Sequence, residues 1–212
     1  MKTTKYLFLA CILLIMSACN SETTESTSTP TKSKTDKETK VIETANGNYL
    51  TFSAQAKPYG LHIPVGWTVK EHAKSGTLEA KTPAKKDTID FPSKVELDIR
   101  KSRMVYNEQT KKMEAQPMDL AAVTKQYLEG LQRNFDEMEI IGVEDTKIAG
   151  TNAKIATYIY LKESDFVNKI KAKTYISYHD SEMYILSFKE EVIGFEAVEL
   201  IFEEMKNSFQ FD

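Results

Sequence analysis

The chain has 212 residues, of which 41% are hydrophobic and 10% aromatic, and its formal net charge is −3. Both cysteines, Cys11 and Cys19, lie within the first 19 residues, so the rest of the chain has no disulfide or thiolate chemistry and must be stabilised by packing. The acidic balance argues against nucleic-acid binding, which needs a clustered basic face, and against docking on anionic lipid headgroups through a basic patch.

Residues 1–18 have the pattern of a signal peptide. Lys2 and Lys5 form a short positive region, and eleven uncharged residues follow at 6–16. A membrane-spanning helix needs about 20 apolar residues, so this run favours a cleaved signal over a span. The tetrapeptide MSAC at 16–19 resembles the lipobox of bacterial lipoproteins, with Met in place of the usual Leu. That resemblance implies a diacylglyceryl group on Cys19 and cleavage just before it.

Residues 19–47 are predicted to be a lipidated cysteine followed by a tether. The segment 21–40 contains eleven Ser or Thr, eight charged residues, one Pro and no apolar side chain. Such a segment cannot bury enough surface to offset its conformational entropy, so we expect a disordered spacer. The alternatives are an ordinary secretory signal with Cys19 incidental, and a glycosylated or protein-binding stalk.

This N-terminal pattern predicts the location of the protein. Two acyl chains on Cys19 would hold the chain stably on a cell membrane, facing outside the cytoplasm. The short signal peptide and the tether rich in Thr and Lys favour a Gram-positive envelope.

Residues 48–212 are predicted to form one globular domain that begins with short strands. Strands are expected at 48–54, 59–63 and 77–80, with a tight turn at 64–67. Residues 95–100 alternate cleanly, placing Val95, Leu97 and Ile99 on the inward face. Residues 103–114 suggest a hairpin that turns through 107–110.

A helix and a second group of strands follow. Asp119 is a suitable N-cap for a helix whose apolar stripe runs from Leu120 to Phe135. Three strands are predicted next, at 140–148, 153–161 and 170–178. A tight turn at 179–182, a strand at 183–188 and an amphipathic helix from Phe195 to Phe209 complete the domain.

The late strands carry apolar or aromatic side chains on both faces. Within 153–161, Ile155 and Ile159 share one face, while Tyr158 and Tyr160 share the other. An antiparallel sheet with one wet face would alternate more cleanly. We therefore predict an α+β fold in which an antiparallel β-sheet is flanked by helices on both faces.

The order of these elements resembles the PsbP-like superfamily, which includes the photosystem II subunit PsbP and the bacterial DcrB-type lipoproteins. The matching pieces are YGLHIPVGW at 59–67, AGTNAK at 149–154 before a Tyr-rich strand, and YILSF at 184–188 followed by a helix and NSFQF at 207–211. The likeness covers about residues 49–211. It implies an α/β/α sandwich and a non-catalytic role in binding or assembling other proteins.

The sequence contains no pattern that predicts a catalytic, cofactor or metal site. His62, His72 and His179 are far apart, and none has a metal-ligand spacing. The polar segment 180–182 beside His179 lacks the scaffold that orients a nucleophile and its base. Acidic residues offer oxygen ligands for Ca²⁺, but a solvated strand face explains them better; they are Asp87, Asp90, Glu96 and Asp98.

Four tyrosines on neighbouring strands are the candidate interaction surface: Tyr158, Tyr160, Tyr175 and Tyr178. Aromatic side chains are enriched at the centres of protein interfaces, so an exposed set would form a recognition surface. The interpretation that we prefer is that they form a second-face core under a helix.

Together these patterns predict a lipid-anchored, non-catalytic protein of the cell envelope that acts as a protein-binding or assembly module. Its partners would be the membrane, through the lipid on Cys19, and an envelope protein of unknown identity. The alternative is a receptor for a small molecule or ion with a pocket between sheet and helix. An open apolar pocket of several hundred Å³ would favour the receptor, and a flat exposed tyrosine patch would favour protein contact.

Overall fold

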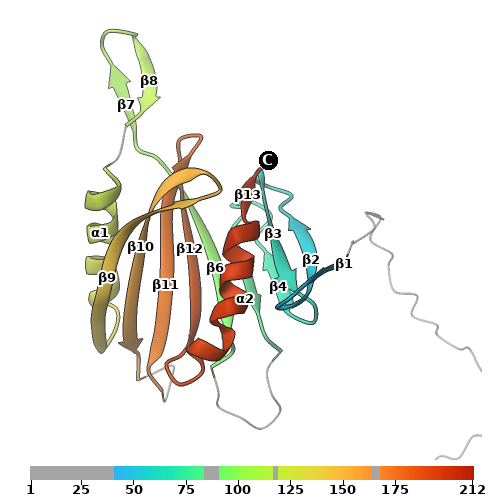
Figure 1. Ribbon diagram of the computed structural model, residues 1–212. Helices are drawn as coiled ribbons and strands as arrows, with labels where there is room; N and C mark the ends of the chain where they lie inside the picture. Colours follow the sequence, from blue (N-terminus) through green and yellow to red (C-terminus); the bar gives the residue numbers. More distant parts are fainter. Residues whose placement is uncertain (1–40, 84–90, 117–118, 164–167) are drawn as a thin grey trace, which may run out of the picture. The chain divides into compact units, whose positions relative to one another are not determined.

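The computed structural model describes residues 41–83, 91–116, 119–163 and 168–212 (Figure 1). The signal peptide, Cys19 and most of the expected tether lie outside these ranges, as do Asp87 and Asp90. The prediction of lipidation therefore stays a prediction.

Seven strands form the larger sheet, in which every neighbouring pair is antiparallel. Their order across the sheet is β4-β5-β6-β12-β11-β10-β9. The strands are β4 (Thr68–Glu71), β5 (Leu78–Lys81), β6 (Lys94–Lys101), β9 (Glu137–Ile148), β10 (Thr151–Leu161), β11 (Ile170–His179) and β12 (Glu182–Glu191). All the late strands that the sequence predicts are present, and each is longer than expected by one to four residues.

Two tight turns fix the register of the late strands. Ala149 and Gly150 join β9 to β10, and Asp180 and Ser181 join β11 to β12, all four with positive φ. Two consecutive positive φ values match the right-handed twist of the flanking strands.

A smaller sheet contains four strands in the order β1-β2-β3-β13. They are β1 (Val41–Thr44), β2 (Gly47–Ser53), β3 (Tyr59–Pro64) and β13 (Gln210–Phe211). Strand β1 corrects the predicted tether, which extended to residue 47, because Ile42 pairs with Tyr49 of β2. A four-residue strand that carries only two strongly apolar side chains is too short for its periodicity to be recognised.

The predicted hairpin is present as β7 (Met104–Asn107) and β8 (Lys112–Ala115), which pair only with each other. It stands beyond the end of the seven-stranded sheet (Figure 1). The turn lies at 108–111, one residue later than predicted, and Lys111 has a φ of 54°.

Two helices, α1 (Leu120–Gln132) and α2 (Phe195–Ser208), complete the domain. Asp119 is the N-cap of α1 as predicted, because its side chain accepts a hydrogen bond from the backbone N–H of Ala121. Phe135 lies beyond the end of α1, yet its ring stacks on Tyr160 with centroids 4.1 Å apart. No helix within the described ranges is long and apolar enough to cross a membrane.

The hydrophobic core is divided between the two faces of the larger sheet. One part joins Leu97, Leu186 and Phe188 of that sheet to α2 and to the smaller sheet. The other part packs Leu128 of α1 on Ala156, Tyr158, Tyr160 and their neighbours. The antiparallel α+β character of the prediction is confirmed.

The predicted sandwich, with helices flanking both faces of the sheet, is only part of the arrangement. Helix α2 shares its face with the smaller sheet, whose Tyr59 and Leu61 belong to the same core. On the other face α1 contacts β10 and β11, while β5 and β6 carry charged side chains there. Sequence periodicity shows that a face is covered, but it does not identify the covering element.

Candidate functional site: the groove between α1 and β9

Three of the four candidate tyrosines lie in the core rather than on the surface. Tyr158, Tyr160 and Tyr175 are 1%, 3% and 4% exposed, and Tyr178 is half-buried. Tyr158 and Tyr160 contact the α1 side of the sheet, whereas Tyr175 belongs to the core on the α2 side. The prediction of an exposed tyrosine surface is therefore wrong for these three residues. The interpretation that we prefer, a core on the second face of the sheet under a helix, is correct for Tyr158 and Tyr160. Burial of large aromatic side chains on both faces explains the weak alternation of these strands.

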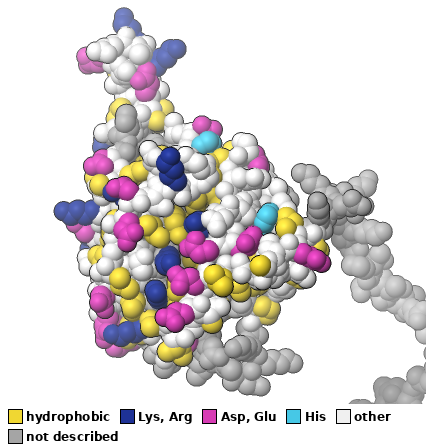
Figure 2. All heavy atoms as spheres, in the orientation of Figure 1, with side chains coloured by type: hydrophobic (Ala, Val, Ile, Leu, Met, Phe, Trp, Pro, Cys, Tyr) yellow, Lys and Arg dark blue, Asp and Glu magenta, His cyan; other side chains and the backbone are white. Residues whose placement is uncertain are grey.

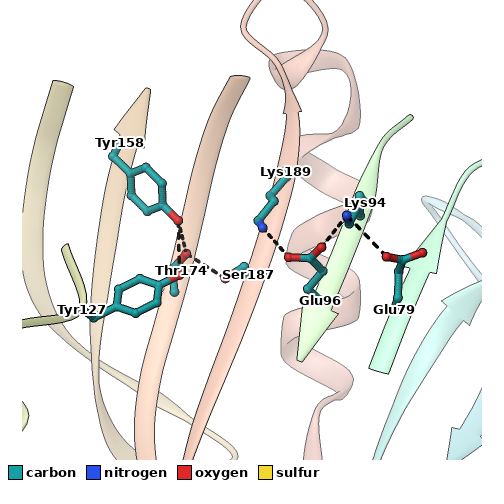
Figure 3. Close-up of polar contacts among 8 residues, drawn as sticks. All are labelled: Glu79, Lys94, Glu96, Tyr127, Tyr158, Thr174, Ser187 and Lys189. Atoms are coloured by element: carbon teal, nitrogen blue, oxygen red, sulfur yellow. Dashed lines mark hydrogen bonds and ion pairs between the residues drawn. The ribbon is translucent and has the colours of Figure 1, made fainter. Parts of the chain in front are cut away.

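The buried hydroxyl of Tyr158 belongs to a polar chain that crosses three strands (Figure 3). Tyr158 Oη lies 3.1 Å from Thr174 Oγ1, which lies 2.9 Å from Ser187 Oγ. The hydroxyls of Tyr127 and Tyr158 are 3.5 Å apart. Burial raises the pKa of Tyr158 well above its usual value, so this hydroxyl stays neutral and serves as a structural hydrogen-bonding group.

Beside this chain, a row of ion pairs occupies the same face of the sheet (Figure 3). Glu96 pairs with both Lys94 and Lys189, and Lys94 Nζ lies 3.4 Å from Glu79 Oε2. Burial alone would raise the pKa of Glu96, but the two lysines outweigh it and lower that pKa. Because two ammonium groups already occupy this carboxylate, it is a poor ligand for Ca²⁺.

The other polar candidates remain scattered. His62 lies on β3 of the smaller sheet, His72 follows β4, and His179 ends β11 with its ring stacked on Phe211 at 3.9 Å. Asp180 lies 3.5 Å from His179, but it is an exposed turn residue. Within the described ranges, no group of three or more His, Cys, Asp or Glu side chains is placed to hold a metal ion.

The feature best suited to binding is an open groove of about 400 Å³ between α1 and the edge strand β9. Leu128, Ile140 and Val143 provide most of its apolar surface. Its other lining residues are Ala121, Thr124, Lys125, Glu129, Gln132 and Lys154. Sequence reasoning did not identify this groove as a site.

A β-bulge in β9 creates the apolar side of this groove. Thr157 of β10 is opposite Gly142, but the next residue, Tyr158, is opposite Ile140, so Ile141 is the extra residue. Without that insertion, positions 140 and 143 would point to opposite faces, because successive side chains in a strand alternate. The bulge instead places Ile140 and Val143 together on the side of α1.

The apolar side chains around the bulge are exposed as a contiguous group. Ile140, Ile141 and Val143 are 39%, 53% and 43% exposed. Single exposed hydrophobic residues are common, whereas a contiguous apolar patch beside a groove marks an interaction site. Three β-branched residues within four positions break strand alternation, and this irregularity is the only sequence signal for the site.

Strand β9 is also the last strand of its sheet, so no described strand pairs with its outer edge. Proteins usually protect such edges with charged side chains and bulges. Both are present here, because Glu139 and Glu144 flank the apolar segment and Asp145 pairs with Lys154 at 2.7 Å. The edge is therefore charged on either side of a short apolar opening.

Comparison with known proteins gives a likeness of fold. No protein-family model and no curated protein matches this sequence. Among solved structures, cyanobacterial PsbP (CyanoP) from Synechocystis sp. PCC 6803 superposes with a TM-score of 0.54 at 13% identity, covering 77% of this chain and 92% of that chain.

Two further structures are similar but more distant. The Ran-binding protein Mog1p of Saccharomyces cerevisiae has a TM-score of 0.49 at 9% identity, covering 78% of this chain and 96% of that one. LpqN of Mycobacterium tuberculosis, described as involved in cell envelope biogenesis, has a TM-score of 0.47 at 13% identity, covering 72% and 82%. The TM-scores of Mog1p and LpqN are below 0.5, so only the CyanoP match carries weight, and it establishes that this domain has a PsbP-like fold.

Proposed function

We propose that this chain is a lipid-anchored, non-catalytic binding module of the cell envelope whose α1–β9 groove takes an extended segment of a partner protein. The observation that carries the proposal is the exposed group Ile140, Ile141 and Val143, beside an open groove at a sheet edge with which no described strand pairs. The anchor and the location outside the cytoplasm rest on the sequence of residues 1–19 alone.

An extended segment can use both features of the site at once. Its backbone would hydrogen-bond to N–H and C=O groups on the edge of β9 that no described strand pairs, as in other complexes formed by strand addition. Alternate side chains of the segment would then point toward α1, where Leu128, Ile140 and Val143 offer apolar contact. Lys125, Glu129 and Lys154 at the groove carry both signs of charge, so the apolar side chains would provide the selectivity.

The composition of the groove supports binding rather than catalysis. General acid–base and nucleophilic chemistry need a nucleophile, a base and a group that orients the base. The groove contains a threonine, two lysines and a glutamate, and the Thr124 hydroxyl donates a hydrogen bond to the backbone carbonyl of Leu120. The Thr124 hydroxyl is therefore used in a hydrogen bond within α1 and is a poor candidate for a nucleophile.

The receptor alternative is supported by the groove volume. About 400 Å³ lies within the range of small-molecule sites, and an apolar lining suits an apolar ligand. We favour the protein segment because the exposed Ile141 and the free strand edge lie outside such a pocket, and only a partner with a backbone would use them.

The binding proposal is tested by photo-crosslinking from Ile141 in intact cells. We expect crosslinks to one extended segment of one partner, and slower amide hydrogen exchange along β9 in the purified complex. Val143→Glu should reduce the crosslinked yield at least tenfold, because it places a charge in the apolar opening. Leu200→Glu is the matched control, since Leu200 is exposed on α2.

Three outcomes would count against a protein segment. Equal crosslinking in Val143→Glu would exclude the groove, and crosslinks spread over many proteins would indicate random contact. Loss of an apolar small molecule from the purified Val143→Glu protein, with no crosslinked partner, would favour the receptor. The anchor is tested separately by labelling with palmitate. The label should be incorporated into the wild type and be absent from Cys19→Ala.

A further inference from the structure

A second cavity, of about 420 Å³, lies at the end of the seven-stranded sheet from which the β7–β8 hairpin projects (Figure 1). Its walls come from the ends of β6, β8 and β11, the starts of α1 and β10, and the turn between β11 and β12. It shares no described residue with the α1–β9 groove. Six of its lining side chains are polar and uncharged: Ser102, Gln116, Thr151, Asn152, Tyr178 and Ser181. Its volume is within the range of small-molecule sites.

The hydroxyl of Tyr178 is the group in this cavity that points to a ligand. Its oxygen is buried, and no described group forms a hydrogen bond with it. Most buried polar atoms have a partner, because an unpaired one costs free energy. Burial raises the pKa of Tyr178, so its hydroxyl is neutral at physiological pH and can both donate and accept. A ligand in the cavity would supply the missing partner.

The other five polar side chains of the cavity form no hydrogen bond with a described residue, whereas the backbone around them is paired. The N–H of Ser102 donates to the carbonyl of Ser181 at 3.1 Å, and the N–H of Gln116 donates to the carbonyl of Arg103 at 2.8 Å. Thr151 and Asn152 pair with β9. A ligand would therefore meet hydroxyl and amide side chains here, and not an unpaired strand edge.

The cavity has no charged residue among those that the structure describes in its walls. Lys101 and Arg103 flank Ser102 in sequence, but neither lines the cavity. Figure 2 shows charged side chains around the projecting end of the hairpin and hydrophobic ones nearer its base. An ionic ligand would lose hydration here without gaining a counter-charge, which is costly. The lining therefore favours a neutral ligand.

We propose that this cavity binds one neutral sugar unit, with the hydroxyls of the sugar paired to Tyr178, Asn152 and Gln116. Sugar hydroxyls both donate and accept, and so do tyrosine hydroxyls and primary amides. Leu120 and the Tyr178 ring would contact the C–H groups of the sugar. An apolar ligand would leave the polar side chains unpaired, and a peptide strand would find no free backbone edge in these walls. The inference depends on neither the anchor nor the α1–β9 groove.

The test is saturation-transfer difference NMR on the full chain in phosphatidylcholine nanodiscs. The probes are the methyl β-glycosides of glucose, galactose, mannose and N-acetylglucosamine. We expect at least one to receive saturation, with a dissociation constant in the millimolar range. Methyl β-glucuronide, which adds a carboxylate to the glucose ring, should bind about tenfold more weakly than methyl β-glucoside or not at all. Comparing each free sugar with its glycoside distinguishes a soluble sugar from a glycan terminus.

Two variants assign the sugar to the cavity. Tyr178→Phe should weaken binding about fivefold, because it removes a hydroxyl that the sugar would pair. Without sugar, the same change should leave the urea midpoint unchanged or raise it, because that hydroxyl has no described partner to lose. Asn152→Ala should weaken binding by a similar factor. Asn207→Ala is the matched control, since Asn207 is exposed on α2, and it should bind like the wild type.

The proposal would be overturned if none of the four glycosides received saturation at tens of millimolar. Saturation that is unchanged in both Tyr178→Phe and Asn152→Ala would place the sugar elsewhere and would equally reject the cavity. Tighter binding of N-acetylglycine N-methylamide than of every glycoside would assign the cavity to a peptide group, and equal binding of the glucuronide would contradict a neutral ligand. Photo-crosslinking from Ile141 reports on the groove alone, so the failure of either proposal can be recognised separately.

Discussion

One face of the seven-stranded sheet has two halves that differ in chemistry. Over β10 and β11, Ala156, Tyr158 and Ala172 are buried against α1. Over β5, β6 and β12, the corresponding positions hold the ion-paired row of Glu79, Lys94, Glu96 and Lys189, with side chains 18–32% exposed. The buried chain of Tyr158, Thr174 and Ser187 lies between the two halves (Figure 3).

The difference arises because α1 covers one half of this sheet face, whereas the other half stays partly exposed to water. Apolar side chains are stabilised where a helix removes them from water, and paired charges suit the half-exposed positions beside it. The hydroxyls of Thr174 and Ser187 join the halves because each group finds a polar partner on a neighbouring strand. Three substitutions and one pH series test this difference.

Leu128→Ala should have the largest effect, because it leaves a cavity where α1 packs on the apolar half. Leu128 is 4% exposed, and such truncations cost about 2–5 kcal/mol of unfolding free energy. Urea unfolding followed by circular dichroism measures the change. Leu200→Ala on the exposed side of α2 is the control and should change it by less than about 0.5 kcal/mol. Similar losses for both would show that α1 contributes little core.

Thr174→Val should have the next largest effect, although the side chains have nearly the same shape. The hydroxyl of Thr174 bonds to both Tyr158 and Ser187, and all three residues are buried. Losing it leaves buried polar groups unpaired, which costs about 1–3 kcal/mol. The double variant Thr174→Val with Ser187→Ala should lose less than the sum of the single losses, and strict additivity would argue against a shared network.

Glu96→Gln tests the charged half. It removes the shared partner of Lys94 and Lys189, and because these side chains are partly solvated we expect a loss of about 1 kcal/mol at pH 7. Asp98→Asn is the control, because the Asp98–Arg100 pair is exposed and should contribute about 0–0.5 kcal/mol. Equal losses of unfolding free energy in the two variants would mean that partial burial does not strengthen the ion pairs of Glu96.

The pH dependence of stability should show the contribution of the ion-paired row. The folded state lowers the pKa of Glu96, and of Glu79, below the model-peptide value of about 4.3. Their contribution is therefore complete above that value and is lost as pH falls through the lower folded pKa. Urea midpoints measured from pH 7 to pH 3 should fall less steeply in Glu96→Gln than in the wild type. Parallel curves would contradict the lowered pKa of Glu96.

Much of the secondary structure could be predicted because its periodicity is local. The alternation of Val95, Leu97 and Ile99 correctly placed them on one buried face, and Asp119 correctly marked the start of α1. The short strands β1, β4 and β13 were missed because two to four residues carry too little periodic information. The candidate tyrosines were placed on the right strands. Their burial depended on helices distant in sequence, because α1 covers Tyr158 and Tyr160, and Tyr175 belongs to the core on the α2 side.

The N-terminal signal pattern with Cys19, the antiparallel α+β class and the capping of α1 could be predicted without a structure, because each depends on neighbouring residues. The element that covers each strand is known only from the folded arrangement. It buried Tyr158 and exposed Ile140 and Val143 through a bulge. Exposure depends on elements that meet only after folding, so composition and periodicity do not contain it.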